Sequence, residues 1–298
     1  MNSMLDELNI LKQLLPSLPQ AEDVVAGPGD DCAAVACGGR RILLAAADQL
    51  VGGVHYYRET TSPEAAGRKL MCRNLSDIAA MGGVPKWALL CVAAGGRSPE
   101  WVLAFCRGAA EAGKRFGVSV IGGDLASLPA EGEVASLTIL GEADAAAFTL
   151  RSGAKPGDLL YVTGEIGNSL ASGHHLDFEP RLAEGRFLAE NGFASAMLDI
   201  SDGLLLDAER LAKASRLRLC IDPAAVPLRA GAERKSALSD GEDYELLFTV
   251  PPGREEELKQ VWKLTKLTRI GVAEPGEPDV CDCSGRSLLR NGKCGYEH

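Results

Sequence analysis

The sequence predicts a two-domain α/β protein from its length, its alternation of strand-like and helix-like segments, and a turn-rich break near its midpoint. The chain has 298 residues, of which 46% are hydrophobic, enough for two ordinary cores. Strand-like apolar runs alternate with helical patterns along most of its length, which is typical of α/β folds. Because the segment from Arg151 to Asp158 is rich in turn residues, we place a domain boundary there, giving residues 1–150 and 151–298.

In the first half, the clearest helix begins at Ser62-Pro63-Glu64, since Ser is a favoured N-cap and Pro is favoured at the first helical position. From Arg68 to Met81 apolar residues occupy most faces, which indicates a buried helix. The expected elements are a helix at 5–15, a strand at 42–47, the helix at 62–81, a strand at 87–93, a helix at 99–116, and strands at 118–121 and 136–141.

In the second half, a strand is expected at 159–163 and another at 244–250, followed by a charged helix at 255–262 and a strand at 268–272. A helix with one apolar face follows Asp202-Gly203. This pattern places its polar side chains in solvent, among them Asp207, Glu209 and Arg210.

The composition excludes several classes of protein. A net charge of -10 and a pI near 5.0 argue against a nucleic-acid partner, because an acidic chain without a local basic cluster repels phosphates. No apolar run reaches the roughly 18 residues that suggest a membrane span. The start of the chain mixes Asp6 and Glu7 into its apolar positions, unlike a secretory signal. We therefore expect a cytoplasmic protein with no membrane partner.

The nine cysteines are too sparse for a disulfide framework, and most stand in apolar or small-residue contexts typical of free buried thiols. Cys281, Cys283 and Cys294, with His298, could be assembled into a zinc site. Their spacing lacks the paired C-x-x-C that makes such a site convincing. Packing therefore remains the favoured role of most of the cysteines.

Several aspartates stand at glycine turns, on a helix face or where an apolar run stops. Asp48 ends the run Ile42 to Ala47, and Asp124 follows the strand at 118–121, and in α/β proteins ligands bind at strand ends. Magnesium takes oxygen ligands and keeps several waters, so it needs acids that converge from separate elements. The pattern indicates a magnesium-dependent, nucleotide-using enzyme. The aspartates are Asp30, Asp31, Asp48, Asp77, Asp124, Asp199 and Asp202.

Some of these aspartates also have a structural explanation. Asp30 and Asp31 follow a Gly-Pro-Gly segment, where aspartate commonly bonds the backbone amides of a solvated turn. Asp77 lies in the buried helix, so it must be exposed, bound to metal, or paired with Lys69 or Arg73. Both interpretations stay open for each residue.

Other polar clusters are less informative. The sequence pattern alone predicts an exposed acidic turn at Glu242, Asp243 and Glu245. It predicts a solvated loop at His174-His175. The chain contains neither a P-loop G-x-x-x-x-G-K-[ST] nor a serine-hydrolase G-x-S-x-G. If ATP binds, metal ions rather than a phosphate-cradling loop must hold its phosphates.

Taken in order, a series of segments resembles thiamine-monophosphate kinase almost from end to end. Three of these segments are long and specific: Asn74 to Gly83, Arg151 to Asp158 and Gly241 to Leu246. The remaining segments are Gly27 to Asp31, Asp48 to His55, Gly122 to Asp124, and Asp199 to Leu204.

The resemblance implies a two-domain fold like that of aminoimidazole ribonucleotide synthetase, with a homodimer formed by the N-terminal sheets and with ATP and magnesium between the domains. It implies direct transfer of the ATP γ-phosphoryl group to thiamine monophosphate, giving thiamine diphosphate. No covalent nucleophile is expected, because the attacking phosphate oxygen is already ionised at neutral pH. The implied metal ligands are Asp30, Asp48, Asp77, Asp124, Asp199 and Asp202, with the main chain of Ala47. The implied ATP contacts are Gly123, Asp124, Arg151 and Ser201, and the implied thiamine-phosphate contacts are His55, Glu242 and Tyr296.

The chain departs from the family pattern at positions where hydroxyl side chains usually help to hold metal. Ala46 and Ala47 precede Asp48, and Leu125 follows Asp124, so side-chain oxygens are lost there. The carboxylates are retained, so we expect an active enzyme, with the number of metal ions left open. Two alternatives also stay open. One is an ATP-dependent synthetase of the same superfamily, which would not be expected to share the Gly-Glu-Asp-Tyr-Glu-Leu segment. The other is a non-catalytic paralogue that binds nucleotide or thiamine phosphate as a sensor.

Overall fold

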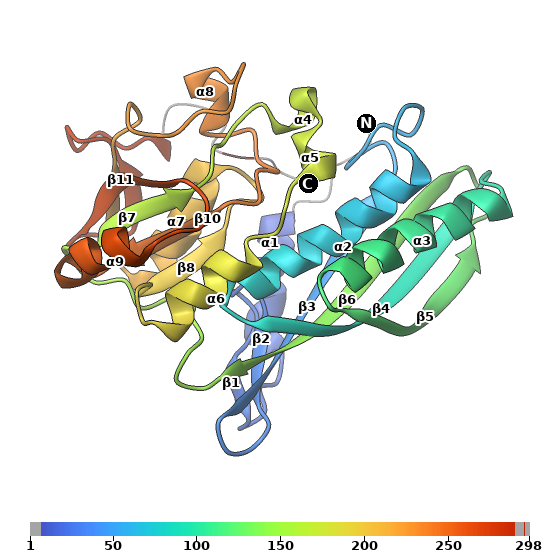
Figure 1. Cartoon of the computed structure of the whole chain (residues 1–298), viewed down its shortest axis with the longest axis horizontal. Coiled ribbons are helices and arrows are strands. Elements are labelled where there is room, and N and C mark those ends of the chain that lie inside the picture. Colours follow the sequence, from blue (N-terminus) through green and yellow to red (C-terminus); the bar gives the residue numbers. More distant parts are fainter. Residues whose placement is uncertain (1–6, 290–294, 296–298) are drawn as a thin grey trace.

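The structure is a computed structural model that describes residues 7–289 and 295. Its strands form two six-stranded mixed sheets, each packed against helices, which confirms the predicted α/β class (Figure 1). The elements of the first half are α1 (Glu7–Leu14), η1 (Leu15–Ser17), β1 (Val24–Ala26), β2 (Ala33–Ala36), β3 (Arg41–Val51), α2 (Pro63–Ala80), β4 (Val84–Gly95), α3 (Pro99–Arg115), β5 (Ser119–Ser127) and β6 (Gly132–Asp144). Those of the second half are β7 (Leu159–Thr163), α4 (Ser169–Ser172), α5 (His174–Asp177), α6 (Leu182–Glu190), β8 (Ala196–Asp199), α7 (Leu204–Ser215), β9 (Arg218–Ile221), α8 (Arg234–Ala237), β10 (Leu246–Val250), η2 (Pro252–Arg254), α9 (Glu255–Val261), β11 (Leu267–Glu274) and β12 (Asp279–Cys281).

The first sheet has the strand order β1-β2-β3-β6-β4-β5, in which only β4 and β5 are parallel neighbours. Helices α2 and α3 lie side by side over one face of this sheet (Figure 1). Their apolar side chains meet those of β3 and β6 in one core, which includes Leu44, Leu75, Ile78 and Leu137. The other face of β4 carries exposed apolar side chains, among them Trp87 and Leu89.

The second sheet has the order β12-β9-β11-β7-β10-β8, in which only β9 and β12 are parallel neighbours. Helix α7 packs on one face, where Leu204 and Leu211 join the strand side chains in a core. On the other face Leu188 of α6 and Leu258 of α9 join a second core. Because both faces are covered, the central strands β7 and β10 are buried at every position.

Helix α2 lies between the two sheets and contacts α3 on one side and α6 on the other (Figure 1). Glycines allow this close packing. A Cβ atom at Gly67 would lie 2.0 Å from the carbonyl oxygen of Phe105 in α3. A Cβ atom at Gly185 of α6 would lie 1.9 Å from the carbonyl oxygen of Ala79. Side chains of α2 can therefore reach both halves of the molecule.

The predicted helices at 62–81 and 99–116 are confirmed, and Ser62 caps the first by accepting the N–H of Ala65 at 3.2 Å. The predicted strand ends are wrong. Strand β3 continues past Asp48 to Val51, and β5 continues past Asp124 to Ser127. The apolar run stops at residue 47 because polar side chains of α2 then face the strand. The backbone ladder with β6 does not stop there.

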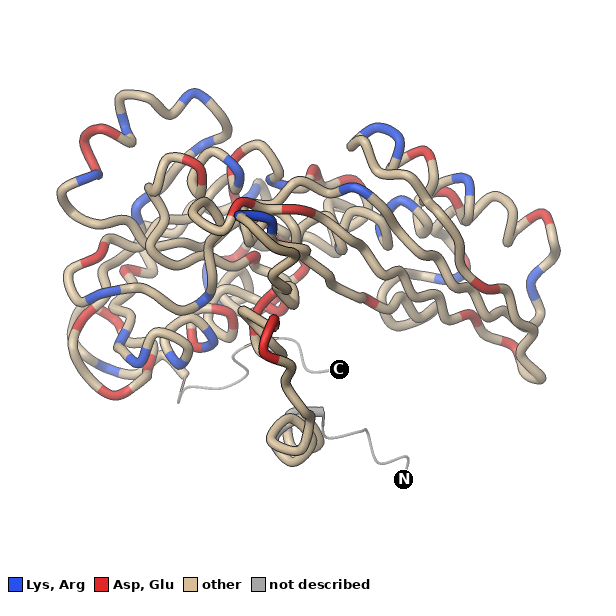
Figure 2. The backbone as a smooth tube through the Cα atoms, turned by 90° about the horizontal axis from the view of Figure 1, so that it is seen from below, with Lys and Arg blue, Asp and Glu red and all other residues tan. Residues whose placement is uncertain are grey.

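Charged residues are spread over the molecule. Figure 2 shows Lys and Arg positions along both lobes, interleaved with Asp and Glu, and shows α1 standing apart from the two sheets. Within residues 7–289, no helix combines the length and the apolar character that crossing a membrane requires.

Candidate active site

Three carboxylates meet beside α2. Asp31 precedes β2, Asp77 lies in α2 and Asp199 ends β8, and one oxygen of each lies within 4.8 Å of the others. The carboxylates of Asp31 and Asp199 are buried, whereas Asp77 is partly exposed. Among the described residues, this is the one group of three or more acids, histidines or cysteines close enough to share a metal ion. We call it the carboxylate cluster. Its all-oxygen donor set fits a hard divalent cation such as Mg²⁺.

The ionised form of the carboxylate cluster is costly without a cation. Burial is the largest effect and raises the pKa of Asp77 and of Asp199 well above its usual value, and the charges of nearby carboxylates raise both further. Ser76 partly stabilises Asp199 by donating a 2.5 Å hydrogen bond to its Oδ2. Asp77 has no hydrogen bond or ion pair to any described residue. A divalent cation would supply the missing positive charge.

Asp30, a metal ligand by resemblance, is not in the carboxylate cluster. Its Oδ1 accepts the backbone N–H of Arg151 at 3.0 Å and that of Asp31 at 3.3 Å. Burial, followed by the charge of Asp31, raises the pKa of Asp30 to about 6. The cluster contains Asp31 instead, and the sequence does not show which of two adjacent turn aspartates faces the site.

The guanidinium of Arg151, an ATP contact by resemblance, forms a two-point ion pair with Asp31. Its Nη2 lies 2.6 Å from Asp31 Oδ1, and its Nε donates to Asp31 Oδ2 at 3.2 Å. Arg151 follows the first sheet in the chain, so this ion pair ties the start of the second half to the carboxylate cluster. Among the described residues, Arg151 is the cation that forms an ion pair with a member of the carboxylate cluster.

Asp48 lies beside the carboxylate cluster rather than in it. It points from β3 toward α2, where Arg73 Nη2 is 3.5 Å from its Oδ1 and Asn74 Oδ1 accepts its backbone N–H at 3.3 Å. The charge of Asp48 still acts on Asp77. The alternative in which Asp77 pairs with Lys69 or Arg73 is therefore wrong, since Arg73 pairs with Asp48.

Asp124 stands well away from the carboxylate cluster within one chain. In the first sheet Asp124 lies opposite Cys91, Cys91 opposite Ser136, and Ser136 opposite Gln49, the neighbour of Asp48. Three strand spacings of about 4.8 Å place Asp124 roughly 14 Å from that end of β3. Asp124, Cys91 and Ser136 line a cavity of about 140 Å³ on the sheet.

Gly123 is fixed by close packing, since a Cβ atom there would lie 1.7 Å from the carbonyl oxygen of Leu90. Of the residues that depart from the family pattern, Ala46 is buried against the core, whereas Ala47 is exposed and Leu125 is 67% exposed. At positions 47 and 125, where the family pattern usually has hydroxyl side chains, this chain therefore exposes apolar groups to solvent.

The turn after β8 is organised by Asp207, which the helical pattern had placed in solvent. Asp207 is buried, and its Oδ2 accepts the backbone N–H groups of Ser201 and Asp202, each at 3.0 Å. Asp202 itself pairs with Arg210 at 2.6 Å and is not a member of the carboxylate cluster. The expectation for Asp207 was wrong because helical spacing identifies the apolar face but not a polar side chain that bonds the preceding turn.

The residues expected at the thiamine-phosphate pocket gather around Lys69, which the sequence suggested only as a partner of Asp77. Lys69 is fully buried, and its Nζ donates to the carbonyl oxygen of His55 at 2.5 Å, lies 2.9 Å from His175 Nδ1 and forms an ion pair with Glu242. Burial lowers the pKa of Lys69 to about 8. Although burial opposes it, the hydrogen bond from His175 and the charge of Lys69 lower the pKa of Glu242 to about 2. Tyr296 lies outside the described residues.

The neighbours of Glu242 are also buried. Asp243 is 0% and Glu245 1% exposed, because Arg229 pairs with Asp243 at 3.3 Å and Arg181 pairs with Glu245 at 2.5 Å. The expectation of an exposed acidic turn was therefore wrong. The expected solvated loop at residues 174–175 is wrong too, since its second histidine is 1% exposed.

The cysteine cluster lies on the second sheet. Cys220 of β9 is opposite Cys281 of β12, both are buried, and Cys283 is exposed. Cys294 and His298, the other members of the possible zinc set, lie outside the described residues. The eight described cysteines are free thiols.

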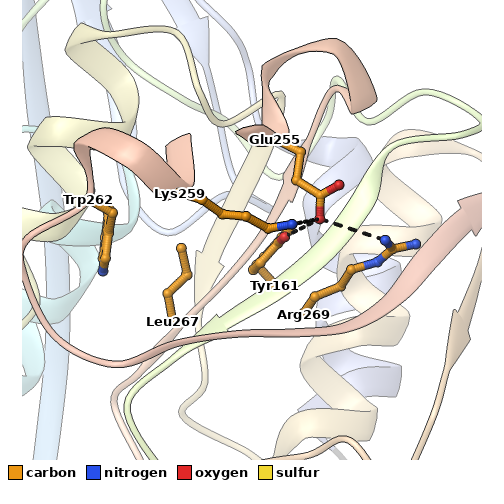
Figure 3. A pocket seen from close by; sticks show the side chains of 6 residues that line it. All are labelled: Tyr161, Glu255, Lys259, Trp262, Leu267 and Arg269. Carbon is orange, nitrogen blue, oxygen red and sulfur yellow. Dashed lines mark hydrogen bonds and ion pairs between the residues drawn. The ribbon is translucent and has the colours of Figure 1, made fainter. Parts of the chain in front are cut away.

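A larger cavity of about 440 Å³ is formed by β7, α9 and β11 and shares no residue with the carboxylate cluster. Its ionisable groups satisfy one another: the Glu255 carboxylate accepts the Tyr161 hydroxyl at 2.6 Å and pairs with Lys259 at 3.0 Å and Arg269 at 3.7 Å (Figure 3). Trp262 and Leu267 complete the lining. Because the Glu255 carboxylate has several partners and both cations contact it, this cavity has no carboxylate as poorly compensated as Asp77 of the carboxylate cluster.

Comparison with known proteins supports the resemblance over almost the whole length of the chain. Residues 29–143 match the family model described as AIR synthase related protein, N-terminal domain. The chain is 32% identical over 325 residues to thiamine-monophosphate kinase of Bacillus subtilis (strain 168), with 99% of each chain covered. It is 33% identical over 283 residues to thiamine-monophosphate kinase of Rhodopirellula baltica, covering 89% of this chain and 88% of that one.

Among solved structures, the chain resembles AaThiL complexed with AMPPCP and TMP, with a TM-score of 0.81 and 30% identity. The alignment covers 98% of this chain and 96% of that chain. The likeness therefore includes both sheets and the elements between them.

Proposed function

The chain belongs to the thiamine-monophosphate kinase family, and from this premise we propose that it transfers the γ-phosphoryl group of ATP to thiamine monophosphate, giving thiamine diphosphate. The observation that carries the proposal is the carboxylate cluster of Asp31, Asp77 and Asp199, which draws its members from both halves of the chain. A likeness over almost the full length to kinases of this family disfavours a synthetase of the same superfamily.

We propose that the carboxylate cluster holds Mg²⁺, with Asp48 close enough to contribute. Bound there, the ion would screen the phosphate charges and align the two reacting groups. Asp31, Asp77 and Asp199 would keep the metal fixed, and Arg151 would neutralise Asp31. The proposed metal ligands thus include Asp31, which the resemblance did not imply. Asp30 instead accepts a hydrogen bond from the main chain of Arg151.

The protein's other contribution would be positioning. The acceptor is a phosphate monoester that is ionised at neutral pH, so no side chain has to remove a proton from it. Lys69 holds Glu242 and the loop of His55 together, and these two residues would orient the thiamine part. Glu242 has φ of 57°, a strained conformation that the Lys69 ion pair helps to hold.

The proposal is tested by following thiamine diphosphate formation from thiamine monophosphate, ATP and Mg²⁺ by chromatography. We expect product from the monophosphate, none from unphosphorylated thiamine, and no turnover after EDTA treatment. A folded protein that binds nucleotide with Mg²⁺ but forms no product would favour the sensor alternative instead.

We also propose a homodimer formed through the N-terminal sheets. Its support is the apolar face of β4 that α2 and α3 do not cover, where Trp87 is 38% and Leu89 39% exposed. Asp124, an implied metal and ATP contact, lies in the adjacent strand. If Asp124 acts in catalysis, a second copy of the chain is one way to bring it to a carboxylate cluster.

Substitution of Leu89 by glutamate is expected to convert the dimer to monomer, because a charge on this face would be buried without a partner. Sedimentation equilibrium would show the mass falling from two chains to one. Lys86→Glu, near the start of the same strand, is the control for added negative charge. An unchanged mass for Leu89→Glu would place any dimer contact elsewhere.

We further propose that the two sheets correspond to two domains, residues 1–150 and 151–298, and that the protein acts in the cytoplasm. The first sheet ends at Asp144 and the second begins at Leu159, which supports the boundary. The free thiols of the described cysteines support a reducing compartment.

A further inference from the structure

Three charged residues lie on one face of α2 at intervals of four: Lys69, Arg73 and Asp77. Four residues of α-helix rise about 6 Å and return to nearly the same face. Asp77 belongs to the carboxylate cluster, and Lys69 bonds to Glu242. Arg73 therefore stands between the expected metal site and the expected acceptor pocket.

The guanidinium of Arg73 is buried but only partly bonded. Arg73 is 8% exposed, its Nη1 donates to the carbonyl oxygen of Gln49 at 3.0 Å, and its Nη2 is 3.5 Å from Asp48. Its Nε has no acceptor among the described residues. The charges of Asp48, Glu242 and Asp77 all act on it. A buried donor without an acceptor is costly, so an additional acceptor at this position would be favourable.

A purely structural role explains these contacts poorly. An arginine that served only to neutralise a carboxylate would be expected to make a short two-point contact, as Arg151 does with Asp31. The contact of Arg73 with Asp48 is single and long. The remaining N–H groups of the planar guanidinium have the geometry that suits phosphate oxygens.

We propose that Arg73 is a catalytic residue that binds the phosphate of the acceptor substrate. This inference rests on the proposed function. In the transfer, an oxygen of the acceptor phosphate forms a bond to the γ-phosphorus of ATP while the bond from that phosphorus to the β–γ bridging oxygen breaks, and ADP leaves. Arg73 neither gains nor loses a proton. Its positive charge offsets the repulsion between the acceptor phosphate and the ATP phosphates, and its N–H groups orient the attacking oxygen.

The test compares the affinities of thiamine monophosphate and of thiamine for the full chain, with Mg²⁺ and a non-hydrolysable ATP analogue, by isothermal titration calorimetry. Arg73→Gln is expected to weaken binding of the monophosphate about 10- to 100-fold, the range for a lost charge-assisted contact, and to leave thiamine binding within about twofold. Arg73→Lys, which keeps a charge, is expected to fall between. In turnover, the KM for the monophosphate should rise and kcat should fall, while the KM for ATP stays nearly constant.

Arg68→Gln is the matched control, because Arg68 lies on the same helix and bonds the carbonyl oxygens of Leu176 and Phe178 and the Glu179 carboxylate, apart from the expected pocket. It is expected to lower the melting temperature without changing the ratio of the two affinities. The inference is overturned if Arg73→Gln weakens the binding of thiamine monophosphate and of thiamine equally. If Arg73→Gln does not fold, the inference is overturned if Arg73→Lys leaves the ratio of the two affinities unchanged.

The outcome for the wild-type protein separates this inference from the proposed function. If the wild type forms thiamine diphosphate and Arg73→Gln keeps the preference for the monophosphate, only the role of Arg73 fails. If the wild type prefers the monophosphate, loses that preference with Arg73→Gln and yet forms no product, the phosphate contact stands and the kinase activity fails.

Discussion

Asp77→Asn is expected to lower kcat/KM by at least ~1,000-fold and, in metal-free buffer, to raise the melting temperature. The activity is expected to fall because Asp77 is an oxygen ligand of the proposed metal site, and such sites supply much of the charge stabilisation in phosphoryl transfer. The stability rises because the same carboxylate is destabilising when no cation is bound. Activity and stability therefore change in opposite directions.

The sign of the stability change follows from the pKa of Asp77. Burial and then the charges of Asp48, Asp199 and Asp31 raise that pKa well above its usual value in the folded state. A carboxyl with a raised pKa favours folding below its unfolded value of about 4, and this contribution is lost as pH rises through the folded pKa. At pH 8 without metal, the folded wild type must either ionise the Asp77 carboxyl or keep on it a proton that the unfolded chain releases. Both lower the free energy of unfolding. Asparagine removes that cost.

The measurement is thermal unfolding at pH 8 with EDTA and with Mg²⁺, alongside steady-state kinetics. We expect Asp77→Asn to melt about 2–4 °C higher than the wild type in EDTA, about 1 kcal/mol for a chain of this size. Mg²⁺ should raise the melting temperature of the wild type more than that of the variant. Asp144→Asn is the control: it removes the charge of an exposed ion pair with Arg40 and keeps an oxygen that can accept the backbone N–H of Ala146, so it should change neither quantity. A lower melting temperature in EDTA together with retained activity would exclude Asp77 from the metal site.

The fold class was predictable because hydrophobic periodicity reports which faces are buried. The long helices at residues 63–80 and 99–115 carried both that signal and Ser-Pro caps. The sheet order was not predictable, since β3 pairs with β6 across nearly a hundred residues. Strand ends were placed early because the apolar run stops at Asp48, which faces polar side chains of α2, and at Gly122 in the exposed strand β5, whereas Asp48 and Asp124 remain in the backbone ladder.

The site was predictable in its chemistry more than in its geometry. Asp77 and Asp199 were identified and lie together, yet their third partner is Asp31 rather than Asp30, a choice that depends on one backbone turn. The roles of Lys69 and Asp207 were missed because they arise from contacts with distant or local backbone groups that no spacing encodes. One signal for Lys69 was available. The helical pattern places this charged residue at a fully buried position, and a buried charge needs partners.

Arg151→Gln should have the opposite effect on stability to Asp77→Asn and also impair catalysis. The Arg151 guanidinium neutralises Asp31, whose carboxylate is 0% exposed, so its loss leaves a buried charge without a partner. Breaking a buried pair in this way costs ~3–5 kcal/mol, or roughly 6–20 °C in melting temperature at this chain length. Because a bound cation can compensate Asp31 in place of the guanidinium, Mg²⁺ should recover part of the lost stability.

In kinetics, Arg151→Gln is expected to lower kcat/KM for ATP about 100-fold, the scale of a lost charge-assisted contact, with a smaller change in the KM for the acceptor. Thermal unfolding with and without Mg²⁺ would be compared with Arg40→Gln, which removes an exposed arginine from the pair with Asp144. A deficit in melting temperature that Mg²⁺ leaves untouched would mean that Arg151 and the metal do not share Asp31. A deficit that shrinks with Mg²⁺ would show that arginine and metal neutralise the same carboxylate, so that metal binding frees the guanidinium to meet the nucleotide.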